Sequence, residues 1–363
     1  MKKLFCTVLA VMLLLALGAC KSEVKVDEDT FADGDYYEQI GGELNILNWG
    51  EYIDEELIDL FEQETGVKIN YIEMTSNEEM LIKLRSSDSP YDLCFPSDYI
   101  IEQMIREDML QPLDMSKIPN AKNIDPRISE ITNTFDPGNK YSLPYMWGTV
   151  GILYNTTMVD DPVDSWEILW NEKYAGQVWM YDSVRDSIGV TLISLGYSLN
   201  TRSEAEVQAA ADKLIAQASI RKGWGTDDLR PTMENGKAAM CVIYSGDAFT
   251  CMDANEDLAF AVPKEGSNVW FDNVIIPKTA KNVEAAHAFI NFLNDGNIAA
   301  RNTEYIYYST PNAAAMERLD PYFTENETYN PPQDVLDRCE VFHDLGDFTE
   351  VYSKAWSSIK SAN

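Results

Sequence analysis

Five short stretches of the chain place an aromatic side chain close to a carboxylate. They are Trp49-Gly50-Glu51-Tyr52, Asp98-Tyr99, Tyr181 with Asp182 and Asp186, Tyr244 with Asp247, and Trp270-Phe271-Asp272. Carboxylates attract cations, and aromatic faces add a cation–π attraction of about 0.5–2 kcal/mol per contact. The rings also cover methylene groups, whose burial contributes about 0.8 kcal/mol each. These residue types indicate a site for a flexible alkyl amine, with acids at its ammonium groups and flat walls between them.

Other interpretations of these pairs stay open. Taken singly, each pair also fits a surface acid beside a core ring, because 11% of the residues are aromatic and 60 are acidic. Paired carboxylates could instead serve an extracytoplasmic hydrolase, with Asp182 and Asp186, or Asp247 and Asp272, as the pair. A serine hydrolase is disfavoured because the Gly-x-Ser-x-Gly motif is absent.

Strands and helices must position these stretches. Alternating apolar residues predict strands over residues 43–49 and 67–71, and an apolar run predicts a buried strand over 91–95. A helix follows each strand; the first ends at Gly66, the second is capped by Asn77, and the third begins at Ser97-Asp98. This order implies a parallel α/β sheet, in which ligands gather at the carboxyl ends of the strands.

The α/β pattern continues along the rest of the chain. Strands are expected over residues 149–154, 176–181, 240–244 and 274–277, and helices near 165–170, 203–218 and 283–294. His287 falls within the apolar face of the last helix, so we expect it to be structural.

The charge of the chain excludes several classes of partner. It carries 28 basic and 60 acidic side chains, a net charge of −32. Such a surface repels phosphate backbones and anionic lipid headgroups, so nucleic-acid binding is not expected. The chain has two histidines and no Cys-x-x-Cys spacing, so we expect neither a metal nor a cofactor. Cys94 lies in an apolar run and is expected to be a buried thiol.

The N-terminus has the pattern of an export signal. Lys2 and Lys3 precede an apolar stretch over residues 4–17, which is too short to span a bilayer comfortably. Leu17-Gly18-Ala19-Cys20 resembles the bacterial lipobox, which implies a signal peptide over 1–19 and acylation of Cys20 with chains such as palmitate; ordinary signal cleavage is the alternative. Residues 20–42 carry many acids and read as a flexible tether. We therefore expect an extracytoplasmic lipoprotein held at the cell membrane.

From about Leu44 to Lys360 the chain resembles the extracytoplasmic spermidine/putrescine-binding proteins of bacterial ABC importers. The landmarks include Asn48-Trp49-Gly50-Glu51-Tyr52, Phe61-Glu-Gln-Glu-Thr-Gly66, Tyr91-Asp-Leu-Cys-Phe-Pro-Ser97, Leu143-Pro-Tyr-Met-Trp-Gly148, Trp270-Phe-Asp272 and Tyr308-Ser-Thr-Pro-Asn312. The resemblance implies a two-lobed α/β periplasmic-binding-protein fold of type II-like topology, with a hinge and a ligand cleft. It places lobe 1 at 43–147 and 271–316 and lobe 2 at 148–270 and 317–363.

The resemblance also implies a function. The protein would be a monomeric receptor without enzymatic activity, which closes its lobes on a polyamine and delivers it to an ABC permease. The same architecture with another cationic solute is the nearest alternative. Together with the aromatic–acid pairs, the resemblance gives the expected ligand-binding set: Trp49, Glu51, Tyr52, Ser97, Asp98, Tyr99, Asp182, Asp186, Tyr244, Asp247, Trp270, Asp272 and Tyr308.

Departures from the family pattern bear on the ligand. Tyr244 stands where the family usually has Trp, and Gly50 replaces a common hydroxyl residue. Ser183 stands where spermidine-type members carry an acid, and the adjacent Asp182 could compensate. Glu51 and Asp247 match acids of putrescine-type members, so the pattern favours putrescine over spermidine. His343 is the candidate for the far end of the site.

Overall fold

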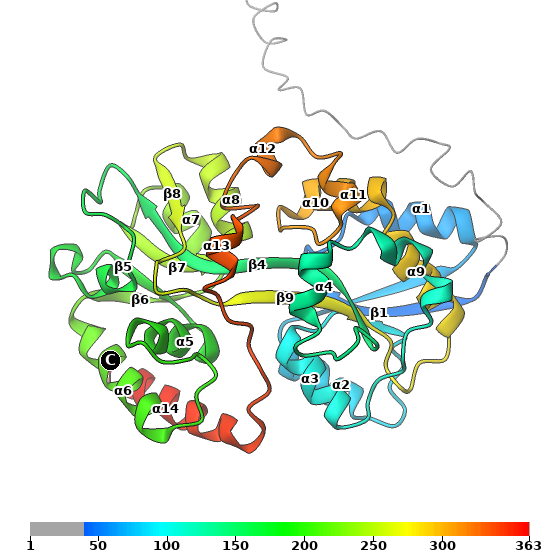
Figure 1. Cartoon of the computed structure of the whole chain (residues 1–363), viewed down its shortest axis with the longest axis horizontal. Coiled ribbons are helices and arrows are strands. Elements are labelled where there is room, and N and C mark those ends of the chain that lie inside the picture. The colour runs from blue at the N-terminus through cyan, green and yellow to red at the C-terminus, as the bar shows by residue number, and fades with distance from the viewer. Residues whose placement is uncertain (1–39, 363) are drawn as a thin grey trace, which may run out of the picture.

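The structure is a computed structural model that describes residues 40–362. The expected signal peptide, Cys20 and most of the tether lie outside these residues. Figure 1 shows two lobes side by side, with two long strands, β4 (Ser142–Asn155) and β9 (Val269–Ile275), running from one lobe to the other. Within the described part of the chain, no helix combines the length and apolar character needed to cross a bilayer.

One lobe contains the N-terminal strand–helix series. Its elements are β1 (Glu43–Trp49), α1 (Glu55–Thr65), β2 (Lys68–Met74), α2 (Asn77–Leu84), β3 (Leu93–Cys94) and α3 (Asp98–Arg106). β1 pairs in parallel with both β2 and β3, as the sequence predicts. α1 ends at Gly66, whose φ of 67° is the left-handed conformation that glycine adopts without steric cost. The prediction that Asn77 caps α2 is wrong, because Ser76 is the N-cap and accepts a hydrogen bond from the amide of Glu79.

The same lobe is completed by later segments. These are α4 (Pro126–Thr132), α9 (Val283–Leu293), α10 (Gly296–Ile306) and α11 (Ala313–Met316). His287 is buried in α9, where its Nε2 accepts a hydrogen bond from the amide of Asp114, which confirms a structural role. Cys94 is fully buried in β3, as expected.

The other lobe packs helices around the far half of the sheet. It contains β5 (Val178–Tyr181), α5 (Val184–Ser194), α6 (Glu204–Ala216), β6 (Arg221–Gly225), α7 (Leu229–Glu234), β7 (Met240–Tyr244), α8 (Ser245–Ala254), β8 (Leu258–Ala261) and the C-terminal α14 (Thr349–Ser361). α12 (Pro321–Thr324) and α13 (Gln333–Leu336) lie above the strands that join the lobes (Figure 1). The helix expected near 165–170 is a 3-10 helix, Trp166–Trp170.

A single mixed sheet of nine strands extends through both lobes in the order β2-β1-β3-β9-β4-β7-β5-β6, with β8 paired to β4. β9 is antiparallel to both β3 and β4, so the sheet departs from the parallel pattern where the lobes join. Carboxyl ends of β1 and β3 in one lobe, and of β5 and β7 in the other, therefore face the region between the lobes.

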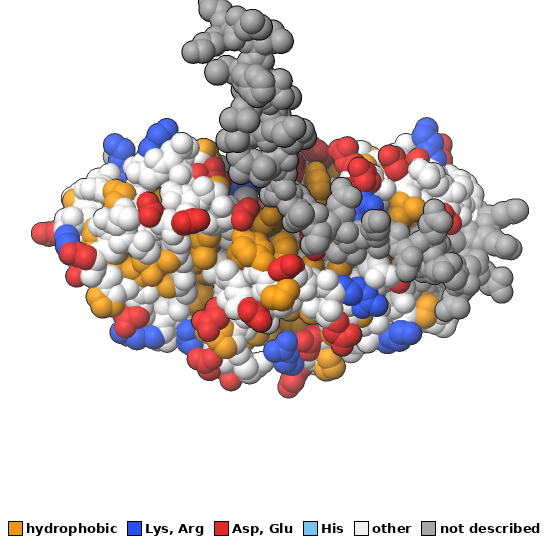
Figure 2. Space-filling view, turned by 90° about the horizontal axis from the view of Figure 1, so that it is seen from above, with side chains coloured by type: hydrophobic (Ala, Val, Ile, Leu, Met, Phe, Trp, Pro, Cys, Tyr) orange, Lys and Arg blue, Asp and Glu red, His pale blue; other side chains and the backbone are white. Residues whose placement is uncertain are grey.

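Acidic side chains are distributed over the surface rather than collected in one patch on the face that Figure 2 shows, where Lys and Arg side chains lie among them. This distribution fits a role of the net charge in solubility.

Candidate ligand-binding site

Asp272 is a buried acid between the lobes that accepts hydrogen bonds from two hydroxyl groups. It lies in β9 with 8% of its surface exposed. Its Oδ1 accepts a hydrogen bond from the Ser97 hydroxyl at 2.6 Å, and its Oδ2 accepts one from the Tyr52 hydroxyl at 2.9 Å. Ser97 is the N-cap of α3 and Tyr52 follows β1, so both donors come from the predicted rim of the sheet. Burial raises the pKa of Asp272 to about 6, although both donors favour its ionised form.

Asp186 forms a second, similar arrangement in the other lobe. It lies in the first turn of α5 and is 5% exposed. Its Oδ2 accepts hydrogen bonds from the hydroxyls of Ser183 at 2.5 Å and Tyr244 at 3.0 Å. Burial raises the pKa of this carboxyl, and the two hydroxyl donors oppose the rise.

Asp247 provides a third carboxylate, in the first turn of α8. Its Oδ2 accepts a hydrogen bond from the Tyr308 hydroxyl at 3.0 Å, and Arg230 lies 3.9 Å from its Oδ1. Removal from solvent raises its pKa to about 6. In all three arrangements, therefore, a tyrosine hydroxyl donates to the acid. Asp272 and Asp186 are buried, whereas the Asp247 side chain is 22% exposed.

Aromatic rings connect the three carboxylates. The ring centroid of Trp270 lies 5.2 Å from that of Tyr308 and 5.8 Å from that of Tyr244. Tyr52 is 5.9 Å from Tyr308, and Tyr181 is 4.8 Å from Tyr244. Burial holds the pKa of the donating phenols well above the ordinary value, so they stay neutral hydrogen-bond donors. The belt of rings supplies apolar walls between points of negative charge.

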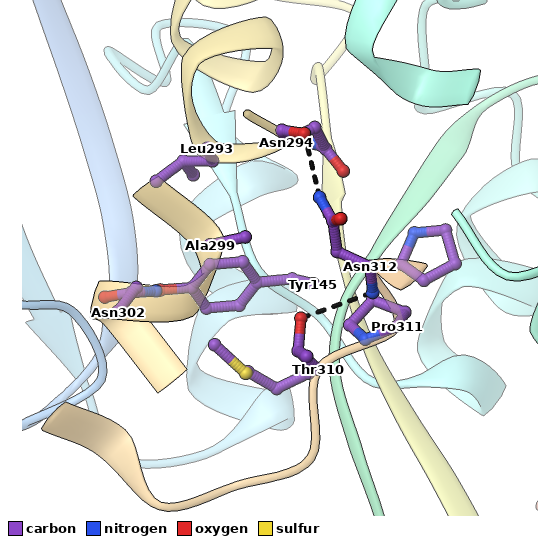
Figure 3. A pocket seen from close by; sticks show the side chains of 10 residues that line it. Tyr145, Leu293, Asn294, Ala299, Asn302, Thr310, Pro311 and Asn312 are labelled. Carbon is purple, nitrogen blue, oxygen red and sulfur yellow. Dashed lines mark hydrogen bonds between the residues drawn. The ribbon is translucent and has the colours of Figure 1, made fainter. Parts of the chain in front are cut away.

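A network behind the belt holds the Tyr52 loop. The Tyr145 hydroxyl donates to the Tyr52 carbonyl at 2.6 Å and accepts from Asn302 Nδ2 at 2.8 Å. Figure 3 shows Tyr145 and Asn302 at a small cavity that is lined also by Thr310 and Asn312. Nothing in the sequence pattern marks Tyr145 or Asn302 as supports, because their partners are distant in the chain.

Three of the predicted ligand-binding acids lie away from the belt of rings. Asp98 is buried and accepts hydrogen bonds from the amides of Tyr99 and Phe271, which fastens α3 to β9. Asp182 lies on the surface, 2.7 Å from Lys360 Nζ. Glu51 is exposed, with a φ of 50°. The structure does not bring these three carboxylates into the belt of rings.

Other expected residues lie at the margin of this region. The Trp49 indole donates to the Phe95 carbonyl at 2.9 Å. The Tyr99 hydroxyl is 3.3 Å from Asn77 Nδ2. His343, the candidate for the far end of the site, has its Nδ1 3.1 Å from Glu102 Oε2 on α3. Its ring therefore contacts α3 rather than the belt of rings.

The sequence analysis missed Arg185, which joins the two lobes beside this site. Its guanidinium carbon lies 4.4 Å from the ring centroid of Phe342 and 5.7 Å from that of Tyr99. It also donates to the His343 carbonyl and to Asn200. A basic residue next to Asp186 was visible in the sequence, but its position over rings from both lobes depends on the tertiary fold.

Comparisons with known proteins agree with this architecture. Residues 56–331 match the family described as bacterial extracellular solute-binding protein. The spermidine/putrescine-binding periplasmic protein of Escherichia coli is 36% identical over 321 residues, covering 88% of this chain and 91% of that protein. A putrescine-binding periplasmic protein of Pseudomonas aeruginosa is 32% identical, covering 88% of this chain and 92% of that one.

A solved structure described as a spermidine/putrescine ABC transporter from Listeria monocytogenes is 43% identical, with a TM-score of 0.83. The match covers 88% of this chain and 99% of that one. These likenesses confirm the predicted two-lobed α/β fold.

Proposed function

The chain belongs to the bacterial extracellular solute-binding protein family, and we propose that it is a polyamine receptor that prefers putrescine to spermidine. One observation carries the proposal: three carboxylates, Asp272, Asp186 and Asp247, lie along a continuous belt of aromatic rings and are largely withdrawn from water. Several relatives in this family carry polyamine-binding names.

Electrostatics favour a cationic ligand over an anion or a neutral sugar. Burying a carboxylate without a counter-charge is costly, and burial raises the pKa of Asp272, whose described partners are the hydroxyls of Ser97 and Tyr52, to about 6. Burial raises the pKa of Asp247 to about 6 as well, although Arg230 lies 3.9 Å from its Oδ1. Ammonium groups would supply the missing charge, and the methylenes between them would be covered by Trp270 and Tyr308. We propose Asp272 at one end of the ligand, and Asp186 with Asp247 towards the other.

The preference for putrescine rests on Ser183. Ser183 is the N-cap of α5 and its hydroxyl donates to Asp186, so position 183 carries no carboxylate where spermidine-type relatives are expected to have one. Asp182 is held by Lys360 and does not replace the missing acid. A shorter diamine therefore fits the charge pattern better than a triamine.

We propose the remaining features of the receptor on the same basis. The lobes would divide at the boundaries expected from the sequence and close on the ligand, and the closed monomer would deliver it to an ABC permease. Acylation of Cys20 would anchor the protein on the outer side of the membrane. A hydrolase is disfavoured because the candidate carboxylates Asp247 and Asp272 are each engaged by a phenol donor, and because the family comprises solute receptors.

Titration calorimetry with putrescine, spermidine, a monoamine and a carbohydrate panel tests the proposal. We expect putrescine to bind most tightly, at about micromolar affinity, or about −8 kcal/mol. At 100 times its dissociation constant, it should add about 2.7 kcal/mol of stability and raise the melting temperature. Binding of an anion or a sugar with no heat from any amine would overturn the proposal, and product release from the carbohydrates would favour the hydrolase.

A further inference from the structure

Gly246 lies where no side chain can fit. A Cβ atom placed on it would lie 2.1 Å from Cδ1 and 2.3 Å from Cε1 of Tyr308, far inside van der Waals contact. Gly246 is the second residue of α8 and its φ is not positive, so its backbone conformation does not require glycine. Alanine is the better helix former by about 1 kcal/mol. The close approach of the Tyr308 ring is therefore the feature that requires glycine here.

This approach joins the two lobes within the belt of rings. Gly246 lies in the first turn of α8, which follows β7, whereas Tyr308 follows α10 in the other lobe. The neighbouring residue Asp247 accepts the Tyr308 hydroxyl at 3.0 Å. The Cδ1–Cε1 edge of the ring therefore lies against the α8 backbone, and the hydroxyl reaches the carboxylate one residue further on.

Tyr308 has little room to yield. Its ring is bordered by Tyr52 at 5.9 Å and by Trp270 at 5.2 Å. The preceding residue, Tyr307, packs against Phe249 of α8, with centroids 5.8 Å apart. Restoring ordinary contact would move the ring from 2.1 Å to about 3.4 Å from the new atom, a shift of about 1.3 Å into the belt of rings.

Trp270 has the same relation to a second glycine. A Cβ atom on Gly148, its partner in β4, would lie 2.8 Å from Cζ2 of Trp270. The rings of Trp270 and Tyr308, which meet nearly at right angles, therefore each pack against the backbone of a glycine.

We propose that Gly246 is a positioning residue that sets the spacing of the two lobes at the belt of rings and thereby selects a slender ligand. The proposal rests on the proposed function, since it assigns a specificity role within the polyamine site. A methyl group at Gly246 would displace Tyr308 towards the ligand or hold the lobes apart. Either result would separate the Tyr308 hydroxyl from Asp247.

Gly246→Ala tests this proposal by calorimetry with putrescine. We expect about tenfold or greater weakening of binding, while the melting temperature of the ligand-free protein stays within a few degrees. Gly189→Ala is the matched control, because Gly189 is also helical and a Cβ there would find ordinary contacts at 3.4 Å. Wild-type affinity in Gly246→Ala would overturn the proposal.

A double-variant comparison separates positioning from a general structural effect. Tyr308→Ala weakens binding by itself, but adding Gly246→Ala should cost little more, because the ring that the methyl group would meet is gone. An equal loss in both backgrounds would overturn the proposal.

A crystal structure of Gly246→Ala gives a readout that is independent of the ligand. A Tyr308 hydroxyl more than 3.5 Å from Asp247 supports the proposal, and a retained distance near 3.0 Å overturns it. If wild type binds no amine in calorimetry, the proposed function fails on that result alone, and this distance still decides the role of Gly246.

Discussion

At the scale of single residues, the proposed site depends on carboxylates that are partly removed from solvent. The folded protein raises the pKa of Asp272 and Asp247 to about 6, above the ordinary aspartate value near 4. The folded state therefore holds protons more tightly than the unfolded state between about pH 4 and pH 6. Stability of the ligand-free protein falls as pH rises through this window. In the proposed site, Asp272 would favour ligand binding at neutral pH at a cost to the stability of the empty protein.

Asp272→Asn should separate these two effects. The amide keeps the size of the side chain and can still bond Ser97 and Tyr52, but it carries no charge. We expect putrescine to bind about 10- to 100-fold more weakly, the range for loss of a hydrogen bond to a charged group. At pH 7 the ligand-free variant should melt at the wild-type temperature or above it. Calorimetry and thermal melting measure the two results.

Asp182→Asn is the matched control, since this acid lies at the surface beside Lys360. Wild-type affinity in Asp272→Asn would remove Asp272 from the site. A binding loss of equal size in both variants would mean that overall charge, rather than a specific contact, attracts the ligand.

The same carboxylates predict a pH dependence of binding. The cation binds the ionised acids, so putrescine affinity should stay nearly constant above about pH 7. It should fall as pH decreases through about 6, because protons then compete with the ligand at Asp272 and Asp247. Calorimetry near pH 6 in two buffers of different ionisation enthalpy should detect protons released on binding. Equal affinities at pH 5 and pH 7.5 would contradict this assignment of the carboxylates.

At the scale of elements, local features were predictable and long-range ones were not. The alternating strand β1 and the glycine stop at Gly66 follow from sequence because each depends on a few neighbouring residues. The sequence predicted only residues 149–154 of β4. The strand is buried along nearly its whole length, so its first half lacks the apolar–polar alternation by which a strand is recognised. The chain order also predicted the rim on which Tyr52 and Ser97 lie.

The candidate site divides in the same way. Its aromatic and acidic residue types were recognisable, so Asp272, Asp186 and Trp270 were expected. Sequence spacing alone did not reveal that Asp98 would bond backbone amides of Tyr99 and Phe271, because Phe271 is 173 residues distant. Nor did it reveal that Ser183, interpreted as a missing acid, would donate to Asp186. Such pairings arise only when separate helices and strands come together.

At the scale of the whole molecule, β4 and β9 run from one lobe to the other, so the proposed closure would be a motion about few connections. Polar contacts between the lobes gather beside the site, where Arg106 pairs with Asp344 and His343 lies against Glu102. The Arg106 side chain is about half exposed, so solvent weakens its attraction to Asp344 to about 1 kcal/mol or less. We expect these contacts to favour the proposed closed arrangement by less than the burial of the carboxylates costs. Without a cation, the empty molecule should therefore favour an open arrangement.

Small-angle X-ray scattering tests this expectation on the protein in solution. Saturating putrescine should lower the radius of gyration of the wild type, because the ligand neutralises acids from both lobes and lets the belt of rings close. Asp272→Asn at the same putrescine concentration, below its own dissociation constant, should keep the larger radius. A wild-type radius that does not change with ligand would show that the lobes are already closed when empty. The ligand would then bind a preformed site, without a shift between open and closed forms.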